Sequence, residues 1–302
     1  MRYSVIDIGS NSVRHLMATV ENGVIDGKKE LIVTRLGEGV DETKQLTERA
    51  INDTVEAIKV FKGKAETMNV EGIYLMATSA VRDSSNKDVL IDRIKNETGL
   101  TIEILSGEKE AIVGCMGVQK GLAQDEPILI IDIGGGSTEF IVYDGEIRHA
   151  SSADVGAVRM TGKHICSDPA TVAERETALE DIKKIIKPHI EAVKAFAFDE
   201  IIGIGGTATT FGAIDLEMDV YDRHKIHNYL VSHEAILRIN AEFHSVTLEK
   251  RKLIKGLTPK RADVITAGGL ILQEIVEDLG MKTFRVSDFD NLEGYLAYKL
   301  AI

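Results

Sequence analysis

Two segments of the chain combine a carboxylate, a glycine turn and small hydroxyl side chains. The first reads Asp7-Ile-Gly-Ser-Asn-Ser12, and the second reads Asp132-Ile-Gly-Gly-Gly-Ser-Thr-Glu139. Successive backbone N–H groups in a turn form a concave site for an anion, and carboxylates suit a hard cation such as Mg²⁺. The second copy begins near the middle of a 302-residue chain. The repeat therefore predicts two related halves that hold a phosphate and a cation in an interdomain cleft.

In the first segment, three side chains are candidate phosphate donors: Ser10, Asn11 and Ser12. Asp7 is a candidate for orienting water around a bound cation, and we predict it as a metal-site residue. A hairpin turn capped by the same polar side chains is the alternative interpretation.

The second segment is more specific because three consecutive glycines are costly to order. A fold keeps them where a side chain would collide with a neighbour or a ligand. Asp132 and Glu139 bracket the glycines, and we predict that this pair holds Mg²⁺ or positions water. A flexible hairpin is the alternative. The predicted phosphate-binding residues of this segment are Gly134, Gly135, Gly136, Ser137 and Thr138.

Two further segments supply candidate reactive groups. In Ser106-Gly-Glu-Lys-Glu-Ala111, the preference of acidic residues for a first helical turn explains Glu108 well and Glu110 less completely. A carboxylate at Glu110 could act as general base for water. Arg82 follows another apolar stretch and could clamp a phosphoryl group in bidentate fashion. A surface Arg paired with Asp83 is the alternative.

Two weaker signals could also bind anions. Gly203-Ile-Gly-Gly-Thr207 follows an apolar stretch and precedes a helix, which predicts a third phosphate contact by Gly206 and Thr207. Close packing of a helix on a strand is the alternative. The basic segment 250–261 could line the path of a polyanion, although charge runs are usually solvated surfaces.

The elements that must position these residues can be read from apolar periodicity and turn signals. Asn22-Gly23 and Asp144-Gly145 each predict a hairpin, and strands alternate with helices after each of them. This order predicts two mixed sheets with helices packed on them, divided into residues 1–124 and 125–302. The predicted strands are 2–8, 15–20, 24–36, 72–78, 101–105, 128–133, 139–143, 146–151, 200–204 and 282–286. The predicted helices run from 47, over 87–96, from 107, over 172–195, over 258–280 and at the end of the chain.

The composition excludes several classes of protein. The net charge of −12 argues against a general nucleic-acid binder. Two cysteines without metal-ligand spacing are typical of free thiols in a reducing compartment. The sequence shows neither a signal peptide nor an apolar run long enough to span a membrane. We expect a cytoplasmic protein with no membrane partner.

These motifs together resemble the exopolyphosphatase/guanosine-pentaphosphate phosphatase (Ppx/GppA) family, over essentially the whole chain. The family belongs to the superfamily of actin, sugar kinases and heat-shock chaperones, which implies two ribonuclease-H-like domains of order βββαβα around a cleft. The resemblance rests on the segments 7–12, 77–82, 106–111, 132–139, 203–207 and 261–265.

The resemblance implies a role for each matching position. Glu110 matches the proposed catalytic base of the family, and Asp132 and Glu139 match its carboxylates for Mg²⁺ and water. Phosphate-contacting positions are matched by Asn11, Arg82, Gly135, Gly136 and Ser137. A homodimer is implied as well.

The chain departs from the family pattern at three places. Lys109 stands where the motif has a second acidic residue, and Ser287–Tyr295 differs from the expected Gly-Leu-Arg type of ending. The sequence stops at residue 302, so we expect it to lack the extra helical domains of longer members.

The resulting expectation is Mg²⁺-dependent release of orthophosphate from the end of inorganic polyphosphate. Guanosine pentaphosphate is the alternative substrate within the family. A kinase of the same superfamily and a nucleotide-gated assembly protein like actin are the more distant alternatives.

Overall fold

The computed structural model describes residues 1–122 and 127–302, and they form two compact units. Unit 1 contains Met1–Lys120 and Asn291–Ile302, and unit 2 contains Gly121–Asp290. The predicted boundary between residues 124 and 125 lies outside the described residues. The last helix differs from the prediction, which placed all of 125–302 in one domain, because it packs within unit 1.

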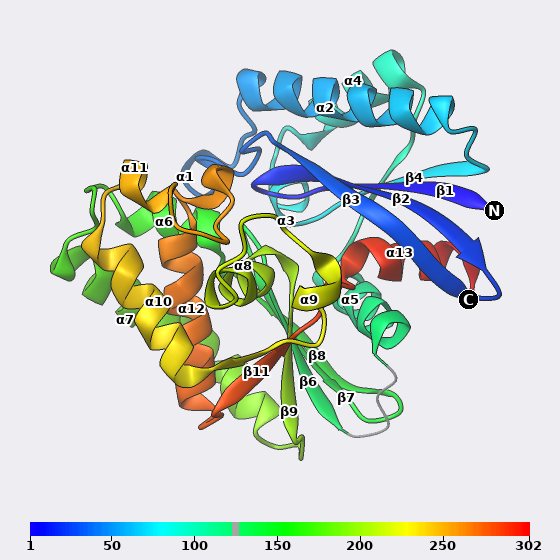
Figure 1. Cartoon of the computed structure of the whole chain (residues 1–302). Helices are drawn as coiled ribbons and strands as arrows, with labels where there is room; N and C mark the ends of the chain where they lie inside the picture. Colours follow the sequence, from blue (N-terminus) through cyan, green and yellow to red (C-terminus); the bar gives the residue numbers. More distant parts are fainter. Residues whose placement is uncertain (123–126) are drawn as a thin grey trace. The chain divides into compact units, whose positions relative to one another are not determined.

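Unit 1 is built on a five-stranded sheet in the order β3-β2-β1-β4-β5, with helices on both faces (Figure 1). Strands β1, β2 and β3 form an antiparallel meander, and β4 and β5 continue the sheet in parallel with β1. Its elements are β1 (Arg2–Ile8), β2 (Ser12–Glu21), β3 (Val24–Val33), α1 (Val40–Thr43), α2 (Glu48–Thr67), β4 (Gly72–Ala77), α3 (Ser79–Arg82), α4 (Lys87–Thr98), β5 (Ile102–Ile104), α5 (Gly107–Gly121) and α13 (Asn291–Leu300).

Local signals explain the β2–β3 hairpin and the helix that follows it. Asn22 and Gly23 adopt the left-handed conformation, with φ of 51° and 78°, as the predicted tight turn requires. The hydroxyl of Thr47 caps α2 by accepting a hydrogen bond from an amide of its first turn. The helix then buries Ile51 and Ile58 against one face of the sheet.

The opposite face of this sheet explains why α13 belongs to unit 1. Leu292, Tyr295 and Leu296 are fully buried in one apolar cluster with Val5 of β1 and residues of β2 and α5. An ion pair of 2.8 Å between Glu293 of α13 and Lys29 of β3 adds a polar contact between the helix and the sheet. Sequence periodicity shows that this helix has an apolar face, but not which sheet receives it.

Unit 2 repeats the arrangement and adds an edge strand. Its six-stranded sheet has the order β10-β11-β9-β6-β7-β8, in which β6, β7 and β8 correspond to the meander of unit 1. Its elements are β6 (Ile128–Ile133), β7 (Thr138–Tyr143), β8 (Ile147–Ala153), α6 (Ala157–His164), α7 (Val172–Val193), β9 (Glu200–Ile204), α8 (Gly205–Asp215), α9 (Arg223–Ile226), β10 (Leu230–Ser232), α10 (His233–Ser245), α11 (Leu248–Arg251), a 3₁₀ turn (Pro259–Arg261), α12 (Ile265–Asp278) and β11 (Thr283–Val286).

The helices of unit 2 depart from the prediction more than its strands do. The predicted helix over 258–280 is wrong at its start, because Pro259 begins only a 3₁₀ turn and α12 begins at Ile265. Helix α10 was not among the predicted helices; its cap is Ser232 and its buried face includes Ile239 and Phe243. In Figure 1, α7, α10 and α12 lie together beside the sheet, and they share one apolar core with it. The fold class of two mixed sheets is confirmed by this model and by the structural comparisons below. Within the described ranges, no helix is long and apolar enough to cross a membrane.

The buried His15 should make unit 1 sensitive to acid. Its ring is 2% exposed, stacks on Phe61 and lies 2.9 Å from the hydroxyl of Ser4. Burial lowers the pKa of His15 to about 4; the charge of Glu30 raises this pKa and that of Lys64 lowers it, both by smaller amounts. Between pH 6.5 and 4, the unfolded chain takes up a proton that the folded protein does not bind. The free energy of unfolding should therefore fall with pH in this window, by about 2 kcal/mol between pH 7 and 5.

Hydrogen exchange of peptides from β1 and β2 at pH 7 and pH 5 measures this loss in unit 1. In His15→Gln, which removes the titration, the loss between the two pH values should be smaller by the contribution of His15. The exposed His224 provides the matched control, and His224→Gln should retain the full loss. An unchanged loss in His15→Gln would contradict the assignment.

Candidate functional site

In unit 1, the carboxyl ends of three parallel strands lie side by side. Ile8 of β1 is opposite Ala77 of β4, which is in turn opposite Ile104 of β5. The loops that follow these strands therefore meet at one edge of the sheet. A contact of 3.1 Å between the hydroxyls of Ser10 and Ser79 joins the first two loops.

The first loop directs backbone N–H groups to one side. The amide of Gly9 donates to the carbonyl of Ser12 at 3.0 Å, which closes the turn. The carbonyls of Ser10 and Asn11 accept hydrogen bonds of 2.8–3.1 Å from the segment 34–37. In a trans peptide the next N–H points opposite to its carbonyl, so the amides of Asn11 and Ser12 point away from that segment. This geometry supports the predicted concave anion site, and we call these N–H groups the cradle of unit 1.

The glycine loop of unit 2 has the same construction. The amide of Gly134 donates to the carbonyl of Ser137 at 2.9 Å, as in the equivalent turn of unit 1. The carbonyls of Gly134, Gly135 and Gly136 accept hydrogen bonds of 2.6–3.0 Å from residues 157–159 at the start of α6. By the same peptide geometry, three successive N–H groups point away from α6. The cradle of unit 2 therefore has three N–H groups, whereas the cradle of unit 1 has two.

Gly156, which the sequence analysis did not single out, allows this packing. A Cβ atom at Gly156 would lie 2.5–2.6 Å from the backbone of Gly135 and Gly136, a distance that real Cβ atoms do not adopt. The absence of a side chain lets the start of α6 approach the glycine loop closely enough to bind its carbonyls.

Asp132 and Glu139 lie directly opposite each other on β6 and β7. Directly opposed residues of an antiparallel pair project from the same face of the sheet. The residues are 7% and 1% exposed, and the hydroxyl of Ser152 donates to Glu139 at 2.7 Å. Mg²⁺ is usually bound by one or two carboxylates and completes its shell with water and phosphate oxygens. The pair therefore fits Mg²⁺, although the described residues contain no cluster of three or more metal-binding side chains.

Asp7, the counterpart of Asp132, lies in a different environment. Its Oδ2 atom accepts hydrogen bonds from Nε of Arg14 at 2.9 Å and from Nη2 at 2.6 Å. The predicted role of Asp7 in orienting water around a cation stays a prediction, and the structure adds a guanidinium that the sequence analysis had not paired with it.

Arg82 and Glu110, which were predicted separately, contact each other. Arg82 ends the short helix α3, and Nη1 donates to Oε2 of Glu110 at 2.9 Å and to the carbonyl of Leu105 at 3.0 Å. Glu110 lies in the first turn of α5 and is 6% exposed. The ion pair places a cationic guanidinium on the carboxylate that is the candidate base.

Lys109 stands where the family motif around Glu110 has an acidic residue, and its side chain contacts other parts of unit 1. It forms an ion pair with Glu103 of β5 and lies over the ring of Tyr298. Burial would raise the pKa of Glu103, but hydrogen bonds from Lys109, Lys299 and Tyr295 lower it to about 2. This network ties the first turn of α5 to α13.

Two of the predicted phosphate donors use their hydroxyl groups within the protein. Thr138 donates to the carbonyl of Val155 at 2.7 Å, and Thr207 donates to the carbonyl of Ile133 at 3.3 Å. These contacts hold the loops in place, and the predicted binding of phosphate by Thr138 and Thr207 stays a prediction.

The basic segment 250–261 divides into residues with different roles. Arg251 is 5% exposed and donates to the carbonyls of Phe243, Val246 and Ala262, so it stabilises local structure. The guanidinium of Arg261 lies directly against Gly206, where a Cβ atom would overlap it. Arg261 thus adds positive charge at the start of α8, next to a predicted phosphate-binding residue.

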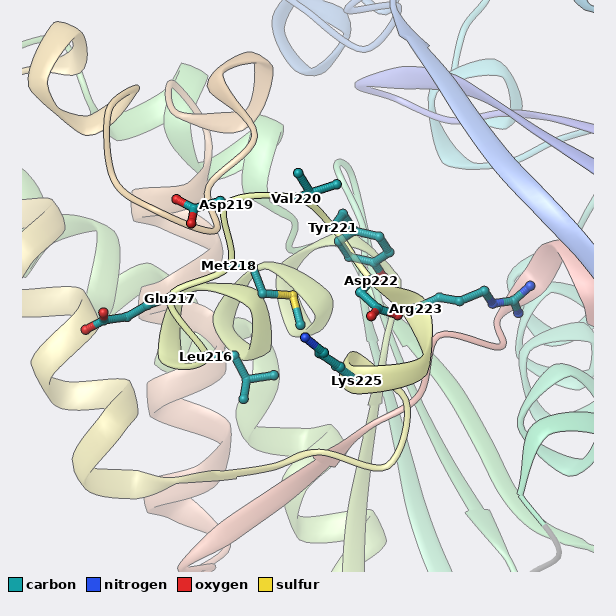
Figure 2. A pocket seen from close by; sticks show the side chains of 9 residues that line it. All are labelled: Leu216, Glu217, Met218, Asp219, Val220, Tyr221, Asp222, Arg223 and Lys225. Carbon is teal, nitrogen blue, oxygen red and sulfur yellow. The ribbon is translucent and has the colours of Figure 1, made fainter.

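An open pocket of about 800 Å³ lies elsewhere, in the segment between α8 and α9. Figure 2 shows its lining, which includes Met218, Tyr221 and Lys225. It contains none of the predicted site residues.

Comparisons with known proteins agree with the motifs. The model of the Ppx/GppA phosphatase family matches residues 24–301. Exopolyphosphatase 2 of Mycobacterium tuberculosis is 31% identical over 99% of this chain and 98% of its own length. The bifunctional 3-dehydroquinate synthase/phosphatase of Fusobacterium nucleatum is 38% identical over 96% of this chain. The guanosine-5'-triphosphate,3'-diphosphate pyrophosphatase of Vibrio vulnificus is 27% identical over 99% of this chain. The match spans only 45% of the Fusobacterium protein and 59% of the Vibrio protein.

Solved structures confirm the fold. The Aquifex aeolicus member of the Ppx/GppA family is 30% identical, with a TM-score of 0.82 over 100% of this chain and 98% of that chain. An exopolyphosphatase from Cytophaga hutchinsonii is 28% identical, with a TM-score of 0.92 and the same coverage of both chains.

Proposed function

The chain belongs to the Ppx/GppA phosphatase family, and on that premise we propose that it hydrolyses the terminal phosphoanhydride bond of inorganic polyphosphate and releases orthophosphate. The observation that carries the proposal is the buried Glu110 paired with Arg82, in a chain with two backbone N–H cradles. This combination supplies a base for water and, in each unit, a group of N–H donors for phosphate oxygens.

The proposed chemistry assigns a step to each group. Glu110 takes a proton from the attacking water, which raises its nucleophilicity as the bond to phosphorus forms. Arg82 stabilises charge on the phosphoryl group during transfer. The N–H groups of residues 11–12 and 135–137 bind the polymer oxygens, and the released unit leaves as orthophosphate. Arg261 at the start of α8 adds a further cationic contact.

The proposed cation is Mg²⁺, held by Asp132 and Glu139. When bound, it neutralises phosphate charge and favours departure of the leaving oxygen. The chain itself must keep both carboxylates ionised and aligned on one face of the sheet, and the hydroxyl of Ser152 orients Glu139 for that purpose. A cytoplasmic location and a homodimer stay predictions.

Guanosine pentaphosphate is the second candidate substrate, because the Vibrio relative carries a name for that activity. The near-complete coverage of the Mycobacterium exopolyphosphatase favours polyphosphate.

Phosphate release from four substrates, with and without Mg²⁺, tests the proposal. Long polyphosphate, tripolyphosphate, guanosine pentaphosphate and ATP should be compared at equal concentrations of terminal phosphate. We expect Mg²⁺-dependent release of orthophosphate, with polyphosphate hydrolysed faster than guanosine pentaphosphate. Hydrolysis of guanosine pentaphosphate without activity on either polyphosphate would replace the proposal with its alternative, and filament formation on addition of ATP without hydrolysis of any substrate would overturn both.

A further inference from the structure

Lys109 occupies an electrostatically unfavourable place in the first turn of α5. The unpaired amides at the start of a helix carry partial positive charge, which favours acidic side chains there and disfavours a cation. Glu108 and Glu110 follow that preference, whereas Lys109 between them does not. A lysine at this point therefore needs a compensating partner, and its contacts show which residues supply one.

Glu103 of β5 supplies the compensating charge and bridges Lys109 to the last helix. One oxygen of its carboxylate binds Lys109. The other oxygen accepts hydrogen bonds from the hydroxyl of Tyr295 at 2.7 Å and from Nζ of Lys299 at 2.6 Å. Lys109 also lies over the ring of Tyr298, with Nζ 4.6 Å from the ring centroid. We call these five residues the Glu103 network.

Tyr295 anchors the Glu103 network in the core of unit 1. It is 1% exposed and packs with Leu292 and Leu296 in one apolar cluster. An isolated, partly exposed ion pair would hold Lys109 only weakly. Because the Tyr295 ring is fixed by the core, however, its hydroxyl holds the Glu103 carboxylate in one place, and this carboxylate limits where Lys109 can lie.

The backbone of Lys109 is continuous with that of Glu110, the proposed base. The amide of Lys109 donates to the hydroxyl of Ser106 at 3.2 Å, and the amide of Glu110 donates to the Ser106 carbonyl at 2.8 Å. The first turn of a helix has few backbone hydrogen bonds of its own and frays easily. A side-chain anchor at Lys109 therefore limits the movement of the turn that carries Glu110.

We propose that Glu103 and Lys109 are positioning residues, which hold the first turn of α5 against α13 and thereby fix the direction in which Glu110 presents its carboxylate. Through Tyr295 and Lys299, the last helix of unit 1 takes part in placing the base. The proposal rests on the proposed function, because it concerns the base of that reaction. It also accounts for a lysine where the family motif has an acidic residue.

Lys109→Met tests the proposal kinetically, because methionine keeps an unbranched apolar side chain and removes the charge. The kcat for orthophosphate release should fall about tenfold, since small displacements of a catalytic group slow a reaction strongly. KM for polyphosphate should stay within about twofold of the wild type, because substrate binding is not changed. Lys109→Arg keeps a cation for Glu103 and should retain kcat within about threefold.

A second substitution should rescue a charge reversal at this position. Lys109→Glu brings two carboxylates together and should lower kcat further than Lys109→Met does, although it introduces the acidic type of the family motif. Glu103→Gln in the same chain removes one of the two charges and supplies an amide donor, so the double variant should have a higher kcat than Lys109→Glu alone. Two independent losses of stability would add and give no such rescue.

Hydrogen exchange of the peptide 105–112 tests the anchor without relying on turnover. The amides of Lys109 and Glu110 should exchange about tenfold faster in Lys109→Met than in the wild type, because local opening becomes easier. Lys59 provides the matched control, since it pairs with Glu56 and Glu97 at the surface of unit 1. Lys59→Met should change neither this exchange nor kcat, and circular dichroism establishes that each variant is folded.

The proposal would be overturned by a folded Lys109→Met with the kcat of the wild type, or with unchanged exchange in the peptide 105–112. A higher KM with unchanged kcat would contradict it as well, and so would a double variant no faster than Lys109→Glu. If Lys109→Glu does not fold, the comparison of Lys109→Met with Lys109→Arg decides. Failure of the proposed function is a separate observation, namely no orthophosphate release by the wild type, and hydrogen exchange then still tests the anchor.

Discussion

Glu110→Gln should lower the kcat for orthophosphate release by at least about a hundredfold, the usual contribution of a general base. The amide keeps the size of the side chain but cannot accept the proton of the attacking water. KM for polyphosphate should change much less, because the N–H cradles that bind the polymer are built from other segments. Steady-state phosphate release at saturating Mg²⁺ measures both constants.

The exposed Glu108 gives a matched control in the same helical turn. Glu108→Gln makes the same chemical change and should retain the kcat of the wild type. Activity of Glu110→Gln within threefold of the parent would refute the assignment of the base. Thermal unfolding by circular dichroism shows whether either variant has lost structure, since Glu110 also contacts Arg82.

Arg82→Met should lower kcat by about a hundred- to a thousandfold, the loss measured when one preorganised donor to a transition state is removed. The methionine fills similar space but cannot donate to Glu110, the Leu105 carbonyl or a phosphoryl oxygen. Arg82→Lys keeps the charge and loses the planar fork, so its kcat should lie between those of the wild type and Arg82→Met.

Arg49 is the control for this series, because its largely exposed side chain forms only a surface pair with Asp53 at 3.6 Å. Arg49→Met should leave kcat and KM unchanged. If Arg82→Met raised KM alone, Arg82 would contribute to binding of the ground state only, and its proposed part in phosphoryl transfer would be wrong.

The strand plan of each unit could be predicted because local signals determine it. Asn22-Gly23 and Asp144-Gly145 mark the two hairpins, and the buried strands end at Ile8 and Ile133, as the sequence indicates. The glycine run at 134–136 likewise predicts the loop whose N–H groups form the cradle of unit 2. These features depend on neighbouring residues, so a local reading of the sequence captures them.

The partners of the site residues could not be predicted in the same way. The pairing of Asp7 with Arg14 requires the strand register, although the shared seven-residue spacing to Arg14 and to Glu139 was a usable signal. The contact between Arg82 and Glu110 joins helices α3 and α5, and the two residues are 28 positions apart in the sequence. The position of Arg261 against Gly206 depends on a turn that the helical pattern did not reveal.

The return of the chain to unit 1 at Asn291 has a consequence for biosynthesis. In topological terms, unit 2 is an insertion between α5 and α13. During translation, the sheet of unit 1 is complete long before Tyr295 and Leu296 emerge to cover its second face. The ribosome must therefore make the whole of unit 2 before unit 1 can cover this second face. Until then, the half that carries Glu110 exposes apolar surface of the kind that chaperones bind.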